Sequence, residues 1–154
     1  VAQPLERGSN NYYSIIQGAA DMELSLSSFD VLDLTFENKV QGSQKLEMET
    51  NVQYSVNVAV NRPQCRGEAW LTVQDKSPTP VVVIKLHAVG VFDFPPVQVT
   101  DEVKRQLHIG TFEMMYPYLS AQVACFTSLV GMPRFIIPKL NIAQDDVMII
   151  NMGK

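Results

Sequence analysis

A run of residues without any charge constrains this chain more than any other feature of its sequence. From Met114 through Pro133 there is no Asp, Glu, Lys or Arg. Pro117 fits the first turn of a helix and Gly131 fits its end, so the run predicts a long helix that begins near Tyr116. A surface helix keeps one polar stripe, whereas a helix without one is covered on both sides. We expect the chain's own sheet to cover one side and a second copy of the chain to cover the other.

Two other interpretations of the run are open at this point. Its length is close to that of a membrane span, but Pro117, Ser120, Gln122, Thr127 and Ser128 interrupt its apolar character, so we expect no span. The second alternative is a central helix buried within a single chain. A chain of 154 residues is short for wrapping such a helix, which favours the second copy.

Length and composition are typical of one domain with extra buried surface. The chain has 46% hydrophobic and 18% charged residues, against about 25% charged in an average globular protein. The net charge is -4 and the basic residues form no cluster, so we expect no nucleic-acid partner. Cys65 and Cys125 fit neither a disulfide framework nor a zinc site. The first sixteen residues lack the organisation of an export signal, which predicts a cytoplasmic protein.

Four segments before the run alternate between apolar and polar residues, as half-buried strands do. They lie at residues 29–37, 51–61, 67–74 and 81–94. We expect a four-stranded antiparallel meander sheet with one apolar and one polar face. In the first strand, Leu32, Leu34 and Phe36 are expected on the apolar face. The connection over residues 38–47 is longer than a tight hairpin, so a crossover is the alternative there.

The predicted fold class is α+β, with the long C-terminal helix packed on one face of the sheet. Thr100 has the properties of an N-cap for a short preceding helix, and Gly110 is expected to separate that helix from the long one. Another short helix is expected after Ile142. Residues 1–22 are interpreted as a loose N-terminal arm, and residues 23–154 as a single domain.

The sequence contains no residue pattern typical of an active site. A glycine-rich phosphate loop, a nucleophile elbow and metal ligands at helical spacing are all absent. His87 and His108 are isolated in sequence, and we interpret each as a surface or boundary histidine rather than a catalytic base. We therefore predict that the protein is not an enzyme and holds neither a metal nor a cofactor.

Apolar residues late in the chain point to binding instead. Five of the seven methionines lie at or after Met114. Flexible thioethers suit surfaces that accept many apolar shapes, although core packing is their commoner use. Pro133 and Pro138 keep residues 132–142 from forming a helix. Where such an apolar segment is exposed, it is a binding surface rather than a core.

In their order and spacing, these features resemble the SecB family of protein-export chaperones. The residues that match late in the chain are Tyr116, Pro117 and Tyr118 at the start of the helix, Gly131 at its end, and Pro133, Pro138, Asn141 and Ile142 in the loop that follows. Upstream, residues 29–37 look like the family's first strand and residues 81–94 like its fourth. The similarity covers about residues 29 to 142.

The resemblance implies an ATP-independent holdase, a chaperone that binds unfolded client polypeptides in apolar grooves without a cofactor. It also implies a homotetramer, a dimer of dimers whose long helices lie between two extended sheets. By position, the client-binding groove comprises Leu46, Met48, Tyr116, Phe135, Ile136, Ile137, Leu140, Ile142 and Met148. A partner-docking surface on the polar sheet face comprises Asp33, Glu37 and Lys85.

The implied partners are unfolded or precursor polypeptides, the export ATPase SecA, or an antitoxin. Asp33 and Glu37 match two acids that dock SecA in the export chaperone, but Lys85 stands where a third acid is expected. A lysine weakens that electrostatic attraction. We therefore favour a relative of the export chaperone, and some relatives are dedicated to the antitoxin of a toxin–antitoxin pair.

Two further alternatives belong to other functional classes. A thioesterase-like enzyme of the hot-dog type also wraps a sheet around a long helix. Its helix normally lies between the first strands, however, and residues 114–131 of this chain offer no acid or base. The other alternative is a structural oligomer that binds no client.

Overall fold

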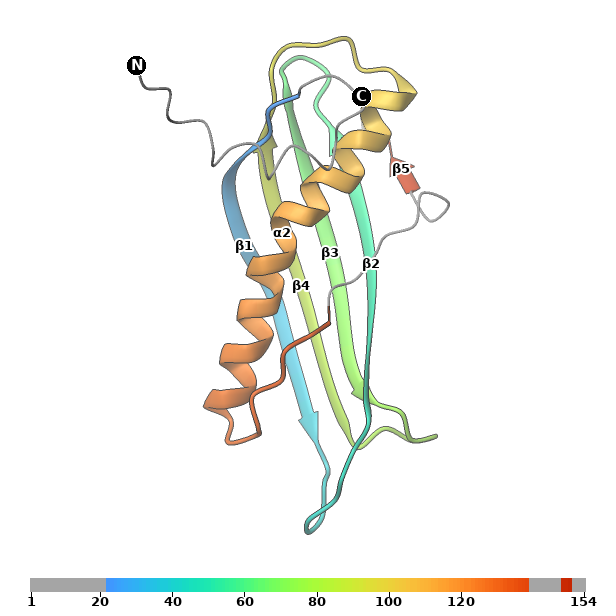
Figure 1. The fold of residues 1–154 in the computed structure, drawn as a ribbon, viewed down its shortest axis with the longest axis vertical. Coiled ribbons are helices and arrows are strands. Elements are labelled where there is room, and N and C mark those ends of the chain that lie inside the picture. The colour runs from blue at the N-terminus through green and yellow to red at the C-terminus, as the bar shows by residue number, and fades with distance from the viewer. Residues whose placement is uncertain (1–21, 139–147, 151–154) are drawn as a thin grey trace, which may run out of the picture.

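Four long strands and one long helix make up most of the computed structural model, which describes residues 22–138 and 148–150 (Figure 1). The elements are β1 (Ser25–Asn38), β2 (Met48–Val58), β3 (Gln64–Asp75), β4 (Val82–Asp93), helix α2 (Asp101–Leu129) and β5 (Met148–Ile150). The strand order in the sheet is β1-β4-β3-β2-β5. Neighbouring strands are antiparallel except β5, which runs parallel to β2.

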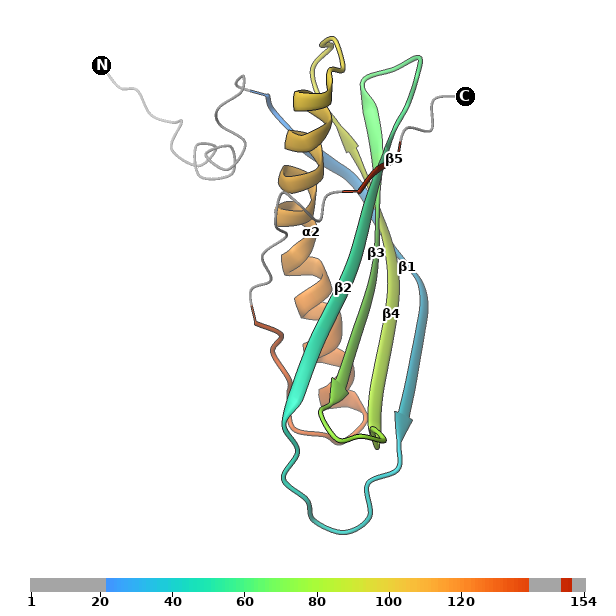
Figure 2. The ribbon, with the colours of Figure 1, turned by 90° about the vertical axis from the view of Figure 1, so that its right-hand side faces the viewer.

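The predicted sheet of four antiparallel strands with a long helix on one face is confirmed. Strands β2, β3 and β4 form the meander, and β1 pairs with β4 on its far side, from Ser25 opposite Asp93 to Asn38 opposite Val82. The connection over residues 39–47 therefore passes across the end of the sheet before β2 begins (Figure 2). This is the crossover alternative that the length of the connection left open.

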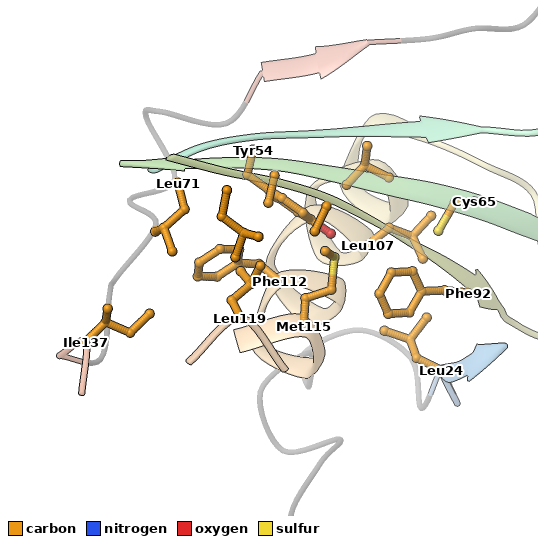
Figure 3. Packing of buried hydrophobic residues seen from close by; sticks show 14 of the residues in the cluster. Leu24, Tyr54, Cys65, Leu71, Phe92, Leu107, Phe112, Met115, Leu119 and Ile137 are labelled. Atoms are coloured by element: carbon orange, nitrogen blue, oxygen red, sulfur yellow. The ribbon is translucent and has the colours of Figure 1, made fainter. Parts of the chain in front are cut away.

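The core lies between α2 and the sheet face that α2 covers. Strand β3 shows the alternation clearly, since Ala69, Leu71 and Val73 are buried while Trp70 on the opposite face is exposed. Figure 3 shows the helix residues that pack onto this face, which are Leu107, Phe112, Met115 and Leu119. The period of two along the strands thus places most of the apolar strand residues on the face that α2 covers.

Two glycines bring the largest core side chains close to the strands. Gly67 and Gly90 are cross-strand neighbours on β3 and β4. A Cβ atom at Gly67 would overlap the hydroxyl of Tyr54, and one at Gly90 would lie 3.1 Å from the ring of Phe92 and 3.2 Å from Sδ of Met115. The missing side chains therefore leave room for aromatic rings from β2 and β4.

The prediction that Leu32 faces the core is wrong. The pairing of β1 with β4 shifts between Val31 and Asp33, which leaves Leu32 outside the register, and its side chain is 51% exposed. A β-bulge of this kind inserts one residue and changes the direction of the side chains around it. Leu34 and Phe36 lie opposite the buried Leu86 and Ile84, and therefore on the apolar face as expected.

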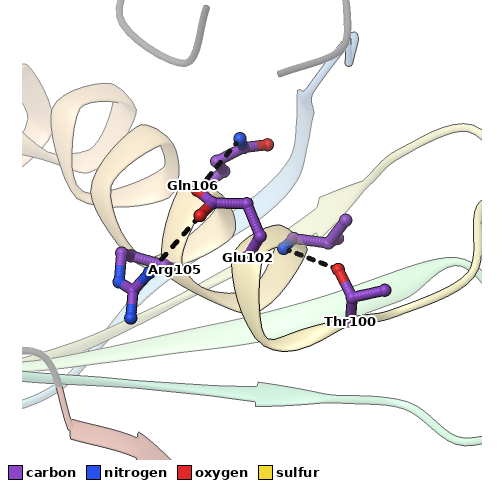
Figure 4. Close-up of polar contacts among 5 residues, drawn as sticks. Thr100, Glu102, Arg105 and Gln106 are labelled. Atoms are coloured by element: carbon purple, nitrogen blue, oxygen red, sulfur yellow. Dashed lines mark hydrogen bonds and ion pairs between the residues drawn. The ribbon is translucent and has the colours of Figure 1, made fainter. Parts of the chain in front are cut away.

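Helix α2 is one continuous helix rather than the predicted short and long pair. Thr100 is its N-cap, and the hydroxyl of Thr100 accepts a hydrogen bond from the Val103 amide at 3.2 Å (Figure 4). The helix continues through both Gly110 and Pro117. Buried residues on each side of these positions pack on the sheet, and such packing outweighs the local helix-breaking tendency of Gly and Pro.

The end of α2 agrees with the sequence-based expectation for Gly131. Gly131 has a φ of +82° and donates its amide hydrogen to the carbonyl of Ser128, while the Met132 amide donates to the carbonyl of Thr127. These two bonds form a Schellman motif, which requires a left-handed residue at this position. In the part of the chain that the structure describes, no helix is long and apolar enough to cross a membrane.

The expected helix after Ile142 is not formed at residues 148–150. Their backbone pairs with Ser55, Val56 and Asn57 of β2 as the parallel strand β5. Ile142 itself lies outside the described residues. Three apolar residues in a row suit a strand beside an existing sheet edge, and the local sequence alone cannot reveal that edge.

His108 belongs to the core, so its interpretation as a surface or boundary histidine is wrong. Its side chain lies beside the ring of Tyr54 at a centroid distance of 5.2 Å, and the residue is 1% exposed. Neither ring nitrogen has a hydrogen-bond partner among the described residues. Burial disfavours the charged form and lowers the pKa of His108. The folded protein therefore holds this imidazole neutral.

We expect the free energy of unfolding to fall below about pH 6.5, the ordinary histidine pKa. Below that pH the unfolded chain binds a proton on His108 more readily than the folded chain, so stability decreases with falling pH by at most about 1.4 kcal/mol per pH unit. Urea unfolding at pH 7.5 and 5.5 measures this loss. The variant His108→Leu should lose clearly less stability over the same interval, and an equal loss in both proteins would contradict the account.

Candidate functional site

An extended apolar segment follows α2 and runs back beside it. We call residues 132–138 the ledge. It lies next to the C-terminal half of α2 and the first half of β2 in both views of the fold (Figures 1 and 2). Two hydrogen bonds hold it, from the Phe135 amide to Oγ1 of Thr127 at 3.0 Å and from Oη of Tyr116 to the carbonyl of Ile137 at 2.8 Å. Helix side chains thus fix an otherwise irregular backbone.

Neighbouring ledge side chains point to opposite sides, as in any extended chain. Ile137 is 1% exposed and packs in the core, whereas Ile136 is 64% exposed and Phe135 is half-buried. The prediction for Ile137 therefore needs correction, because a side chain in the core does not line an open groove. Ile136 and Phe135 form the accessible apolar surface of the ledge.

The remaining predicted groove residues lie at the margin of the core. Met48, Tyr116 and Phe135 are partly buried and pack against the central cluster, and Leu46 is half-buried just before β2. The structure thus brings the crossover connection, the helix and the ledge to one side of the fold. Leu140 and Ile142 lie outside the described residues, and Met148 lies in β5, of which the structure describes only the backbone.

Sequence reasoning missed the open edge of β2. We call the side of residues 48–54 that faces away from β3 the β2 edge. Among the described residues no strand pairs with it, and β5 begins only opposite Ser55. The Oγ1 atom of Thr50 on this stretch is buried and has no hydrogen-bond partner in the described part of the chain. Alternation predicts a strand but not its position in the sheet. The edge can therefore be recognised only from the strand pairing in the structure.

A second exposed surface lies on α2. The helix face comprises Pro117, Tyr118, Ala121, Gln122, Cys125 and Leu129, all exposed in the single chain. It carries no charge, and Leu129 is 79% exposed. The alternative of a helix buried all round within one chain is therefore wrong, because the sheet and the ledge leave this side uncovered among the described residues.

The polar face of the sheet holds the three predicted docking residues. Asp33 pairs with His87, and Lys85 pairs with Thr35, which lies between Asp33 and Glu37 on β1. All three side chains therefore lie on the face opposite α2. The same face carries an aromatic pair that the sequence analysis did not predict. Trp70 stacks on His87 with ring centroids 4.8 Å apart.

Polar contacts fix the ring of His87 in that pair. Its Nε2 atom lies 2.5 Å from a carboxylate oxygen of Glu68. Trp70 and Glu68 belong to β3 and His87 to β4, so register alone places them together. The arrangement suits a surface contact, since Trp70 remains partly exposed.

The described residues offer little chemistry for catalysis. They contain no group of three His, Cys, Asp or Glu side chains that could hold a metal ion. Both cysteines are free thiols, Cys65 buried and Cys125 exposed. Burial raises the pKa of the Cys65 thiol to about 12, which removes it as a nucleophile at neutral pH.

The sheet, the single long helix and the apolar segment that returns along it define the SecB-like fold. The resemblance expected from the sequence motifs is confirmed at this level. A solved structure of the SecB-like chaperone Rv1957 of Mycobacterium tuberculosis, in complex with a ChAD peptide from the HigA1 antitoxin Rv1956, is similar with a TM-score of 0.67 and 13% identity. The match covers 84% of this chain and 99% of that one.

Other comparisons add no functional information. A protein of unknown function from Streptococcus agalactiae has 14% identity and a TM-score of 0.44, with 78% of this chain and 100% of that chain covered. No protein-family model matches the chain. No curated protein matches it by sequence. The similarity therefore establishes the fold alone.

Replacing Thr127 by Val should release the ledge from α2. Val has nearly the same shape but no oxygen to accept the hydrogen bond of the Phe135 amide. Loss of one such bond costs about 1 kcal/mol, so the exchange of the Phe135 amide hydrogen should become several-fold faster. Ser128→Ala is the control, because among the described residues Oγ of Ser128 bonds to the carbonyl of Ala124 and not to the ledge. Equal exchange rates in the two variants would show that Thr127 does not hold the ledge.

Proposed function

We propose that the protein is an ATP-independent holdase that binds unfolded polypeptides beside the ledge. The observation that carries this proposal is the course of the ledge beside the first half of β2, with Ile136 exposed and Phe135 half-buried (Figures 1 and 2). An extended client would place apolar side chains on the ledge and its backbone along the edge. Leu46, Met48 and Tyr116 would border the same groove.

The physical basis is a pair of interactions that demand no particular sequence. Burying apolar surface contributes about 25 cal/mol per Å² whatever the order of residues. Backbone pairing with a strand edge adds affinity without reading side chains. The ordering of the client opposes both terms, which suits a chaperone that must also release what it binds.

The antitoxin-bound similar structure supports a polypeptide client and favours a second, narrower candidate. The protein would then serve one antitoxin rather than many precursors. Lys85 lies between the acids Asp33 and Glu37 on the outer face. Its positive charge weakens the electrostatic attraction that would dock SecA there. We therefore place a dedicated or general cytoplasmic chaperone ahead of a component of protein export.

The proposal includes neither a cofactor nor a catalytic reaction. A hot-dog-type enzyme is disfavoured because α2 follows all four long strands instead of lying between the first ones. A structural oligomer without a client leaves the exposed Ile136 unexplained. The function we propose uses surfaces rather than reactive groups.

We also propose that the chain forms a tetramer through the helix face. A charge-free helix surface with a leucine at 79% exposure is unfavourable in water and suits contact with a second copy of the same helix. β1 is the other edge strand of the sheet, and its outer side gives a second contact. Two different contacts of this kind build a dimer of dimers.

Introducing a charge into the groove tests client binding. Ile136→Asp should weaken binding of a fluorescent, permanently unfolded polypeptide at least tenfold, because it puts a carboxylate where apolar surface is buried. Val60→Asp is the matched control, since Val60 is similarly exposed but lies beyond the opposite end of β2. Fluorescence anisotropy gives both affinities. Equal weakening by both variants, or by neither, would remove the ledge from the site.

Introducing a charge into the helix face tests assembly. Ala121→Glu should convert the tetramer into smaller species, because a buried carboxylate at a two-fold contact meets its own copy. Val97→Glu, at an exposed position before α2, should leave assembly intact. Light scattering measures the mass against the 17.2 kDa of one chain. A wild-type protein that is monomeric at micromolar concentration would contradict this part of the proposal.

A further inference from the structure

Strand β2 is an edge strand with an incomplete partner. On one side it pairs with β3 along its whole length, from Met48 opposite Asp75 to Val58 opposite Cys65. On the other side the described residues contribute only three pairs, between Ser55–Asn57 of β2 and Met148–Ile150 of β5. An edge of this kind presents unpaired amide and carbonyl groups that can accept another strand.

The pairing of β5 is weak compared with the rest of the sheet. It has three residue pairs, whereas β2 and β3 share eleven. It is also parallel, and parallel pairs are slightly less stable per residue than antiparallel ones. A strand of three residues cannot form a stable pair on its own, so β5 holds its place through its covalent attachment to the domain.

That attachment makes a weak strand an effective competitor. A segment tethered to its own binding site acts at an effective concentration in the millimolar range. Its residues, Met148, Ile149 and Ile150, are apolar and uncharged, as are the extended segments that the proposed groove would take. The edge positions Ser55–Asn57 continue the β2 edge without interruption, so a client strand longer than a few residues would reach them.

We propose that β5 is a built-in substitute for the client, which occupies the continuation of the β2 edge at Ser55–Asn57 and is displaced when an unfolded chain that pairs with the β2 edge extends there. This inference rests on the proposed holdase function and adds regulation to it. Displacement sets a threshold, because a client must pair over a longer stretch than β5 to replace it. If β5 occupies the edge about nine-tenths of the time, its removal strengthens client binding about tenfold.

Two proline substitutions in the full chain test the inference. The double variant Ile149→Pro/Ile150→Pro removes two adjacent backbone donors, and one of them faces β2 because neighbouring strand residues direct their amides to opposite sides. Ile149→Val is the matched control, because valine favours strands. The probe is fluorescent α-lactalbumin, reduced and carboxymethylated so that it stays unfolded. Circular dichroism and thermal unfolding verify that all variants keep the fold.

The expected result is a dissociation constant five- to tenfold lower for the double proline variant and within twofold of wild type for Ile149→Val. Unchanged or weaker binding by the double proline variant would overturn the inference and would mean that β5 is idle or forms part of the groove, as the placement of Met148 there suggested. Failure of every protein, wild type included, to bind the probe would overturn the proposed function and this inference together.

A peptide added in trans gives a second, independent readout. The peptide DVMIINMGK has the sequence of residues 146–154 and should displace the probe from the double proline variant at millimolar concentration. The peptide DVMPPNMGK, which carries proline at the positions of Ile149 and Ile150, should not. Equal displacement by the two peptides, or displacement by neither, would show that the segment does not compete through strand pairing.

Discussion

The structure depends on the burial of one sheet face under a single helix. Leu71, Phe112 and Leu119 are almost fully buried at this contact. Within the described residues no second sheet covers the other side of the helix. A two-layer domain of this kind buries only one side of α2. The opposite side keeps its charge-free residues exposed in the single chain, so this side is open to contact with another molecule.

The second consequence concerns the chain after the helix. The Schellman motif at Gly131 reverses its direction, and Thr127 and Tyr116 then hold residues 132–138 extended beside β2. One side chain of this segment completes the core and the next faces solvent. The same backbone therefore closes the domain and provides the apolar surface of the proposed groove.

Much of this fold could be predicted from local patterns, and the errors have common physical causes. Alternation gives the strands and Thr100 gives the helix start, because both depend on neighbouring residues. The exposure of Leu32 depends on a bulge in the pairing with β4, and the continuity of α2 through Gly110 depends on packing against the sheet. The groove was predicted from family motifs, but Ile137 is a core residue in the structure. The β2 edge depends on the order of the strands in the sheet, which a local sequence pattern does not give.

The most direct test of a holdase is suppression of aggregation without ATP. A chemically denatured reporter enzyme, diluted into buffer with increasing amounts of the wild-type protein, aggregates at a rate that light scattering measures. The account predicts that aggregation stops when about one assembly is present per reporter chain, and that adding ATP changes nothing. Full aggregation in a several-fold excess of folded, assembled protein would contradict a general holdase and would restrict the groove to a single partner or to none.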